Sequence, residues 1–86
     1  MRNTSADSDL RDILEWALRE LQSLQPFSAN APPGAQPHIK QIGDMLEDVR
    51  AEAYGARFAS DPSAKEALRL KDRASAYLRE HEHRWR

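Results

Sequence analysis

The stretch that decides the fold is PHIKQIGDMLEDVRAEAYGARFASDPSAKEALRL, which covers residues 37–70. Apolar residues recur every three or four positions on both sides of the short segment 60–61, and this spacing predicts one amphipathic helix before the segment and another after it. Asp61 followed by Pro62 indicates a helix start, because Asp is a favoured N-cap and Pro fits the first turn. Two helices joined by so short a link pack antiparallel, so we expect a helical hairpin.

A further helix is predicted before the hairpin, over residues 7–25. Asp7 or Ser8 is expected to cap its start, since short polar side chains accept hydrogen bonds from the free N–H groups of a first turn. Pro26 is expected to end it, because the residue before a proline avoids the helical conformation. The Pro- and Ala-rich segment 26–36 is then a loop that tethers this helix to the hairpin.

The two helices of the hairpin are predicted over residues 37–59 and 62–82. Placing successive residues about 100° apart gives each of the three helices one apolar face for burial. In chain order, the residues on these faces are Leu10, Ile13, Leu14, Ala17, Leu18, Leu21, Leu24, Ile39, Ile42, Met45, Leu46, Val49, Ala53, Ala56, Ala67, Leu70, Ala74, Tyr77, Leu78, His81 and Trp85.

The 86 residues are expected to form one all-α domain with a thin core, because a chain of this size buries only about 60% of its unfolded surface. Small domains commonly depend on disulfides, metals or partner chains, and this sequence has no cysteine. We therefore expect a homodimer in which two hairpins build a four-helix bundle, with the N-terminal helices on the outside. The alternative is a monomeric three-helix bundle.

Composition also restricts the class of partner and the location. Thirteen Lys and Arg residues against 14 Asp and Glu residues give a net charge of −1, which argues against a bulk nucleic-acid binder. No apolar run approaches the roughly 20 residues of a membrane span, and the first residues lack the apolar core of a signal peptide. We expect a cytoplasmic protein, without membrane binding, and the Arg- and Ala-rich usage is typical of a bacterial source.

Catalytic, cofactor and metal sites are not predicted. His81 and His83 stand two residues apart and point in opposite directions on a helix, whereas helical metal sites use ligands three or four residues apart. The sequence contains neither an HExxH motif nor a Gly-rich phosphate loop, the patterns that would indicate a metalloprotease or a nucleotide site. The protein is therefore expected not to be an enzyme.

The function expected instead is a protein-interaction module: a small adaptor, inhibitor or accessory subunit, of a size that suits a phage- or plasmid-encoded inhibitor. Trp16 and Trp85 are candidate contact residues, because tryptophan is a frequent interface anchor. Asp44, Asp48 and Glu52 are spaced four residues apart and form an acidic stripe that would attract a basic partner. The other interpretation of this stripe is a solvated helix face.

The alternative function is a small DNA-binding regulator. Lys65, Arg69 and Arg73 are spaced four residues apart on the last helix, which such a protein would present to the major groove. Acidic residues, among them Glu66 and Asp72, are interspersed with these basic residues. Such a mixture of charges is more typical of a solubilising helix face. DNA binding therefore ranks second.

Overall fold

The computed structural model describes residues 2–56 and 61–86, and every regular element within those ranges is helical. The elements, in chain order, are α1 (Arg2–Leu24), the short α2 (Phe27–Asn30), α3 (Gln36–Gly55), α4 (Pro62–His81) and the 3-10 helix η1 (Glu82–Arg84). The predicted all-α fold class is thus confirmed for the described part of the chain.

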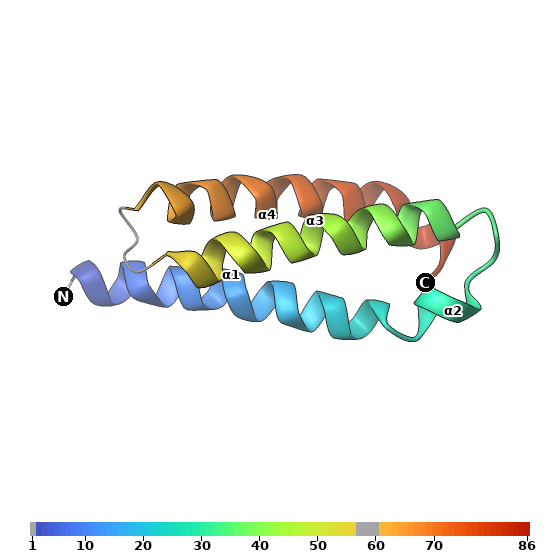
Figure 1. Ribbon diagram of the computed structural model, residues 1–86, viewed down its shortest axis with the longest axis horizontal. Coiled ribbons are helices and arrows are strands. Elements are labelled where there is room, and N and C mark those ends of the chain that lie inside the picture. Colours follow the sequence, from blue (N-terminus) through green and yellow to red (C-terminus); the bar gives the residue numbers. More distant parts are fainter. Residues whose placement is uncertain (1, 57–60) are drawn as a thin grey trace.

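The central element is α3, which packs along both α1 and α4, whereas α1 and α4 contact each other less. Figure 1 shows α1 and α4 running in the same direction, with α3 antiparallel to both. The bundle is elongated, at 47 × 19 × 17 Å, because a helix of 20 residues is already about 30 Å long. α3 and α4 therefore form the predicted antiparallel pair, and α1 packs on α3 of its own chain.

The core combines large aliphatic side chains on α3 with alanines on the two flanking helices. The largest fully buried side chains are Ile42, Leu46 and Val49. Ala17 of α1 and the α4 residues Ala67 and Ala74 are all 0% exposed. Small residues on the outer helices leave room for the large side chains of the central one, which is how a three-helix core reaches the packing density of a protein interior.

Enlarging one of these alanines is expected to destabilise the bundle. Ala67→Leu adds three carbon atoms where α4 meets the core, and overpacking of this kind costs about 1–3 kcal/mol of unfolding free energy. Urea denaturation monitored by circular dichroism measures the loss. Ala76→Leu is the matched control, because Ala76 is exposed on the same helix. Equal denaturation midpoints for the two variants would contradict the packing described above.

The bounds of the first helix differ from the prediction at one end. α1 begins at Arg2, so Asp7 and Ser8 lie inside the helix, and their prediction as caps is wrong. The residues before them include no Pro or Gly, the two residue types that most strongly interrupt a helix. At the other end α1 stops at Leu24, as the proline at position 26 predicts.

The second predicted helix is shorter than expected. α3 covers Gln36–Gly55, and Ala56 has extended backbone with φ −83° and ψ 132°, so the predicted continuation to residue 59 is wrong at Ala56. Gly55 is the physical reason, because glycine is among the residues that favour a helix least. Residues 57–59 lie outside the described part of the chain. α4 ends at His81, within one residue of the prediction.

The predicted loop between the first two long helices contains one helical turn, α2. The Ser28 hydroxyl donates a hydrogen bond to the Gln25 carbonyl at 2.8 Å, and the Asn30 side-chain amide donates to the Pro26 carbonyl at 3.3 Å. Phe27 is half-buried against the core. Local side-chain bonds and one aromatic contact thus give structure to a segment whose composition predicted an irregular loop.

Candidate interaction surfaces

One side of α1 faces α4. The Lys71 ammonium group lies 5.6 Å from the centre of the Trp16 ring, and the Glu20 carboxylate pairs with the Arg86 guanidinium at 3.2 Å. Trp16 and Glu20 therefore mark the flank of α1 that is directed at α4 and the C-terminal residues. Side chains about 200° further around the helix point to the opposite flank.

That opposite flank carries Leu14, Leu18 and Leu21, which we name the leucine face. Leu14 and Leu18 each stand two positions from Trp16, and Leu21 follows Leu14 by seven residues, nearly two full turns. Leu18 is 42% exposed, while Leu14 and Leu21 are half-buried at the edge of the core. The leucine face is thus an apolar strip on the outside of the bundle.

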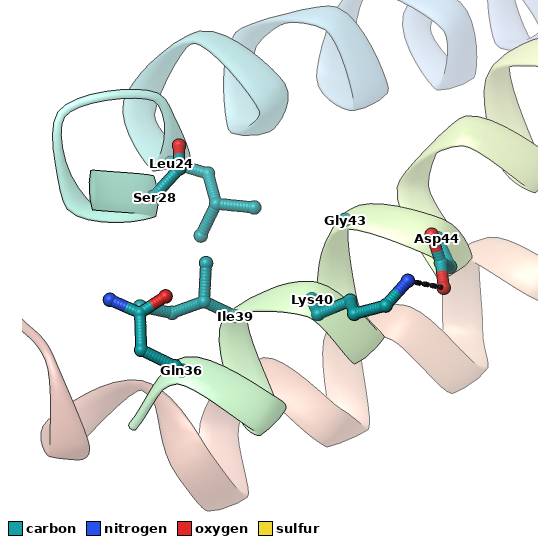
Figure 2. Close-up of a pocket in the computed structure, with 7 residues that line it drawn as sticks. All are labelled: Leu24, Ser28, Gln36, Ile39, Lys40, Gly43 and Asp44. Atoms are coloured by element: carbon teal, nitrogen blue, oxygen red, sulfur yellow. Dashed lines mark ion pairs between the residues drawn. The ribbon is translucent and has the colours of Figure 1, made fainter. Parts of the chain in front are cut away.

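A pocket with a volume of about 330 Å³ opens one turn beyond Leu21, between the end of α1, α2 and the start of α3. Figure 2 shows the side chains of Leu24 and Ile39 pointing toward each other at its centre, with Lys40 and Asp44 on its rim. The remaining lining residues are Ser28, Gln36 and Gly43. The pocket is therefore apolar inside, and its rim carries both charges.

Gly43 contributes to this pocket by having no side chain. A Cβ atom added there would lie 3.6 Å from Leu24 Cδ2, which is an ordinary van der Waals distance. The approach of α1 to α3 therefore does not require glycine, although an added methyl group would occupy part of the pocket.

The two tryptophans have different surroundings. Trp16 is half-buried and partly covered by Lys71. Trp85 is only 7% exposed and belongs to the core cluster, and its indole N–H has no hydrogen-bond partner among the described residues. Of the two predicted contact residues, Trp16 keeps more surface for a partner, whereas Trp85 closes one end of the bundle.

The acidic stripe lies on α3. Asp44 and Asp48 are exposed and Glu52 is half-buried. The Asp44 carboxylate pairs with the Lys40 ammonium group at 3.7 Å, an exposed pair of the kind that contributes little to stability. Asp44 also borders the pocket, so one end of the stripe meets the end of the leucine face.

The basic residues Lys65, Arg69 and Arg73 are all exposed along α4. The Arg69 guanidinium, however, donates two hydrogen bonds to the Glu66 carboxylate, one of them at 2.9 Å. These bonds lower the pKa of Glu66 and raise the pKa of Arg69. A phosphate group would have to displace Glu66 to reach this guanidinium fully, which weakens the case for a DNA-binding stripe.

The structure also brings together three side chains that were not predicted to meet. His38 Nδ1 lies 2.9 Å from the Tyr77 hydroxyl, and the His38 and His81 rings stack with their centres 4.4 Å apart and an interplanar angle of 18°. The register of the hairpin is the signal that would have found them. In an antiparallel pair of helices with the same rise per residue, a residue near the start of α3 faces one near the end of α4, as His38 does with Tyr77 and His81.

The protonation of this cluster follows from its surroundings. Burial, together with the charges of His81 and Arg84, lowers the pKa of His38 below its ordinary value of 6.5. Burial also raises the pKa of the Tyr77 hydroxyl above 10.0. His38 and Tyr77 are therefore uncharged at neutral pH, which suits a hydrogen bond between a hydroxyl donor and an imidazole acceptor.

Within residues 2–56 and 61–86, no three His, Asp or Glu side chains are grouped in a way that could hold a metal ion. None of the helices in the described ranges combines the length and the apolar character needed to cross a membrane. No protein-family model matches the sequence, and neither does any curated protein or solved structure.

Proposed function

We propose that this protein is a non-catalytic interaction module that binds a partner protein through the leucine face of α1. The observation that carries the proposal is the 42% exposure of Leu18, between Leu14 and Leu21 on the outside of the bundle. Burying a leucine side chain completely is worth about 1.5–3 kcal/mol. A partner that covered Leu18 would gain part of this free energy and would extend the contact over both neighbouring leucines.

The shape of the surface favours a helical partner segment. An amphipathic helix that presents apolar residues three and four positions apart would lie along the leucine face. The pocket one turn further on would receive one larger apolar side chain between Leu24 and Ile39. Lys40 and Asp44 on the rim would then meet polar groups of the partner, which is the usual arrangement of an apolar centre and a polar border.

An adaptor, an inhibitor and an accessory subunit all fit this description. A homodimer through the leucine face fits it too, because a second copy supplies the same surface, although this dimer differs from the expected one, in which two hairpins pack together and the N-terminal helices lie outside. Two leucine faces related by a two-fold axis are self-complementary. A cytoplasmic location fits the absence of cysteine, since disulfides are rare in reducing compartments.

The variant Leu18→Lys tests the proposal. It places a charge at the centre of the leucine face and is expected to weaken partner binding at least about tenfold, equivalent to 1.4 kcal/mol. Sedimentation analysis measures self-association, and capture from a lysate of the source cells, followed by titration of the purified partner, measures binding to another protein. The fold is expected to remain intact, because Leu18 is largely outside the core.

Leu68→Lys is the matched control, because Leu68 is 50% exposed on α4, away from the leucine face. The proposal requires that the same partner, or the same dimer, is retained by the wild type and by Leu68→Lys and is lost with Leu18→Lys. Equal binding by both variants, or a monomer that retains no specific partner, would refute it.

A further inference from the structure

A row of residues on α3 runs beside the leucine face of α1. Its members are spaced four, three and four residues apart and are Gly43, Glu47, Arg50 and Tyr54. We name them the α3 row. At about 100° per residue they fall within an arc of about 60°, so they share one side of the helix. A Cβ atom at Gly43 would lie 3.6 Å from Leu24 Cδ2, which places this side next to α1.

The middle of the α3 row is level with the middle of the leucine face. α1 and α3 run in opposite directions (Figure 1), and Leu24 lies beside Gly43. Because both helices rise by the same amount per residue, a step back from Leu24 to Leu18 on α1 corresponds to a step forward from Gly43 to about residue 49 on α3. The two surfaces therefore form one continuous face on the outside of the bundle.

The α3 row carries three kinds of group. Tyr54 is 77% exposed, more than either Leu18 or Leu68. Glu47 and Arg50 form an ion pair, in which the guanidinium Nε–H group donates to the carboxylate at 2.8 Å. Gly43 lines the pocket at the end of the leucine face. One side of α3 thus presents an apolar pocket, a pair of opposite charges and an exposed aromatic ring.

The spacing of the α3 row is the same in both chain directions. A two-fold axis perpendicular to α3, midway between Glu47 and Arg50, therefore sets Tyr54 of one copy opposite Gly43 of another. The same axis sets Glu47 opposite Arg50 of the other copy. We propose that the partner of the leucine face is a second copy of this chain, packed antiparallel across this axis, with each Tyr54 ring in the pocket of the other copy. This inference rests on the proposed function and names its partner.

The pocket suits a tyrosine side chain. Leu24 and Ile39 point toward each other at its centre, and Lys40 and Asp44 stand on its rim (Figure 2). A tyrosine has an apolar ring for the centre and a polar hydroxyl for the rim. This hydroxyl can donate to the Asp44 carboxylate or accept from the Lys40 ammonium group. Both ends of the Tyr54 side chain therefore meet groups of matching polarity.

The charges favour this antiparallel arrangement. Around the axis, two Glu47–Arg50 pairs come together with alternating signs, so each carboxylate faces a guanidinium of the other copy. A parallel arrangement would set each of these charges against its own copy, and contacts between like charges disfavour a complex. An unrelated helix would have to match the leucines, the charges and the pocket separately, whereas a single symmetry axis matches all three.

The variant Tyr54→Ala tests the contact with the pocket. It removes the aromatic side chain and is expected to weaken self-association at least about tenfold, because tyrosines in pockets contribute strongly to interfaces. Sedimentation equilibrium of the full chain measures the affinity. Leu68→Ala is the matched control, since Leu68 is 50% exposed on α4, and it should self-associate as the wild type does. Far-ultraviolet circular dichroism should be unchanged in both variants.

Glu47→Arg and Arg50→Glu together test the contact between charges. The first variant places two arginines in the middle of the row and the second places two glutamates there, so each alone should self-associate at least about tenfold more weakly than the wild type. An equimolar mixture should form heterodimers with an affinity near that of the wild type, because every charge again faces its opposite. Native mass spectrometry distinguishes the heterodimer from either homodimer. Misfolding cannot imitate this recovery, since heterodimers require both variants to be folded.

A wild type that stays monomeric at the highest concentrations measured would overturn the inference. So would a dimer whose affinity is the same in Tyr54→Ala, or a mixture of the two charge variants without heterodimers. The proposed function fails separately. If Leu18→Lys abolishes a dimer that Tyr54→Ala retains, or abolishes the binding of another protein to a monomeric wild type, the leucine face remains an interaction surface and only the antiparallel pairing is wrong.

Discussion

Leu46→Ala is expected to lower the free energy of unfolding by about 2–5 kcal/mol. Leu46 is 0% exposed near the middle of α3, the helix that packs on both of its neighbours. The truncation removes apolar contacts and leaves a cavity that two rigid outer helices close only in part. Because small domains have only about 5–15 kcal/mol of stability in total, the variant should show a large shift of its urea midpoint.

The control for this loss is a leucine on the surface. Leu68 is 50% exposed on α4, and Leu68→Ala should change the free energy of unfolding by no more than about 0.5 kcal/mol. Both variants lose the same three carbon atoms from a helix, so the difference between them reports burial alone. Similar urea midpoints for the two variants would show that α3 is not the centre of the core.

Trp85→Ala is the second large effect, with an expected loss of about 3–5 kcal/mol. Trp85 is 7% exposed and packs with the core although it stands next to the last residue of the chain. Its removal also releases Arg86, which pairs with Glu20 of α1. Thermal unfolding and urea denaturation at about pH 7.5 measure this loss.

Two companion variants separate the causes. Trp85→Phe keeps most of the apolar contact and removes an N–H group that is buried without a partner in the described structure. Because such a group costs about 1–3 kcal/mol, this variant should lose much less stability than Trp85→Ala. Trp16→Ala should also lose less, since Trp16 is only half-buried. If Trp16→Ala is the more damaging of the two alanine variants, the assignment of Trp85 to the core is wrong.

The helices themselves were predictable because their signals are local. The spacing of Ile39, Ile42, Leu46, Val49 and Ala53 predicts one buried face, and all five are buried in α3. A proline at position 26 predicts the end of α1 from the conformation of a single peptide unit. The start of α1 was predicted wrongly, because a residue type that suits an N-cap acts as a cap only where the helix actually begins.

The candidate site was predictable only in part. Leu18 belongs to the predicted apolar stripe of the first helix, yet it is the exposed residue that carries the proposed interface. Periodicity gives the width of an apolar face, but the neighbouring helices decide how much of that face they cover. For the same reason the sequence could not show that Trp85 is buried while Trp16 keeps exposed surface.

By itself, the sequence determined that the chain is helical, where most of its helices lie, and that α3 and α4 are antiparallel, because capping, proline and short links act over a few residues. Only the tertiary structure decided that α1 packs on its own hairpin, because the long connection before α3 permits other placements. The stacking of the His38 ring on the His81 ring is likewise visible only in the tertiary structure. Such contacts join residues far apart in the sequence, and their free energy depends on shapes that exist only once the helices have packed.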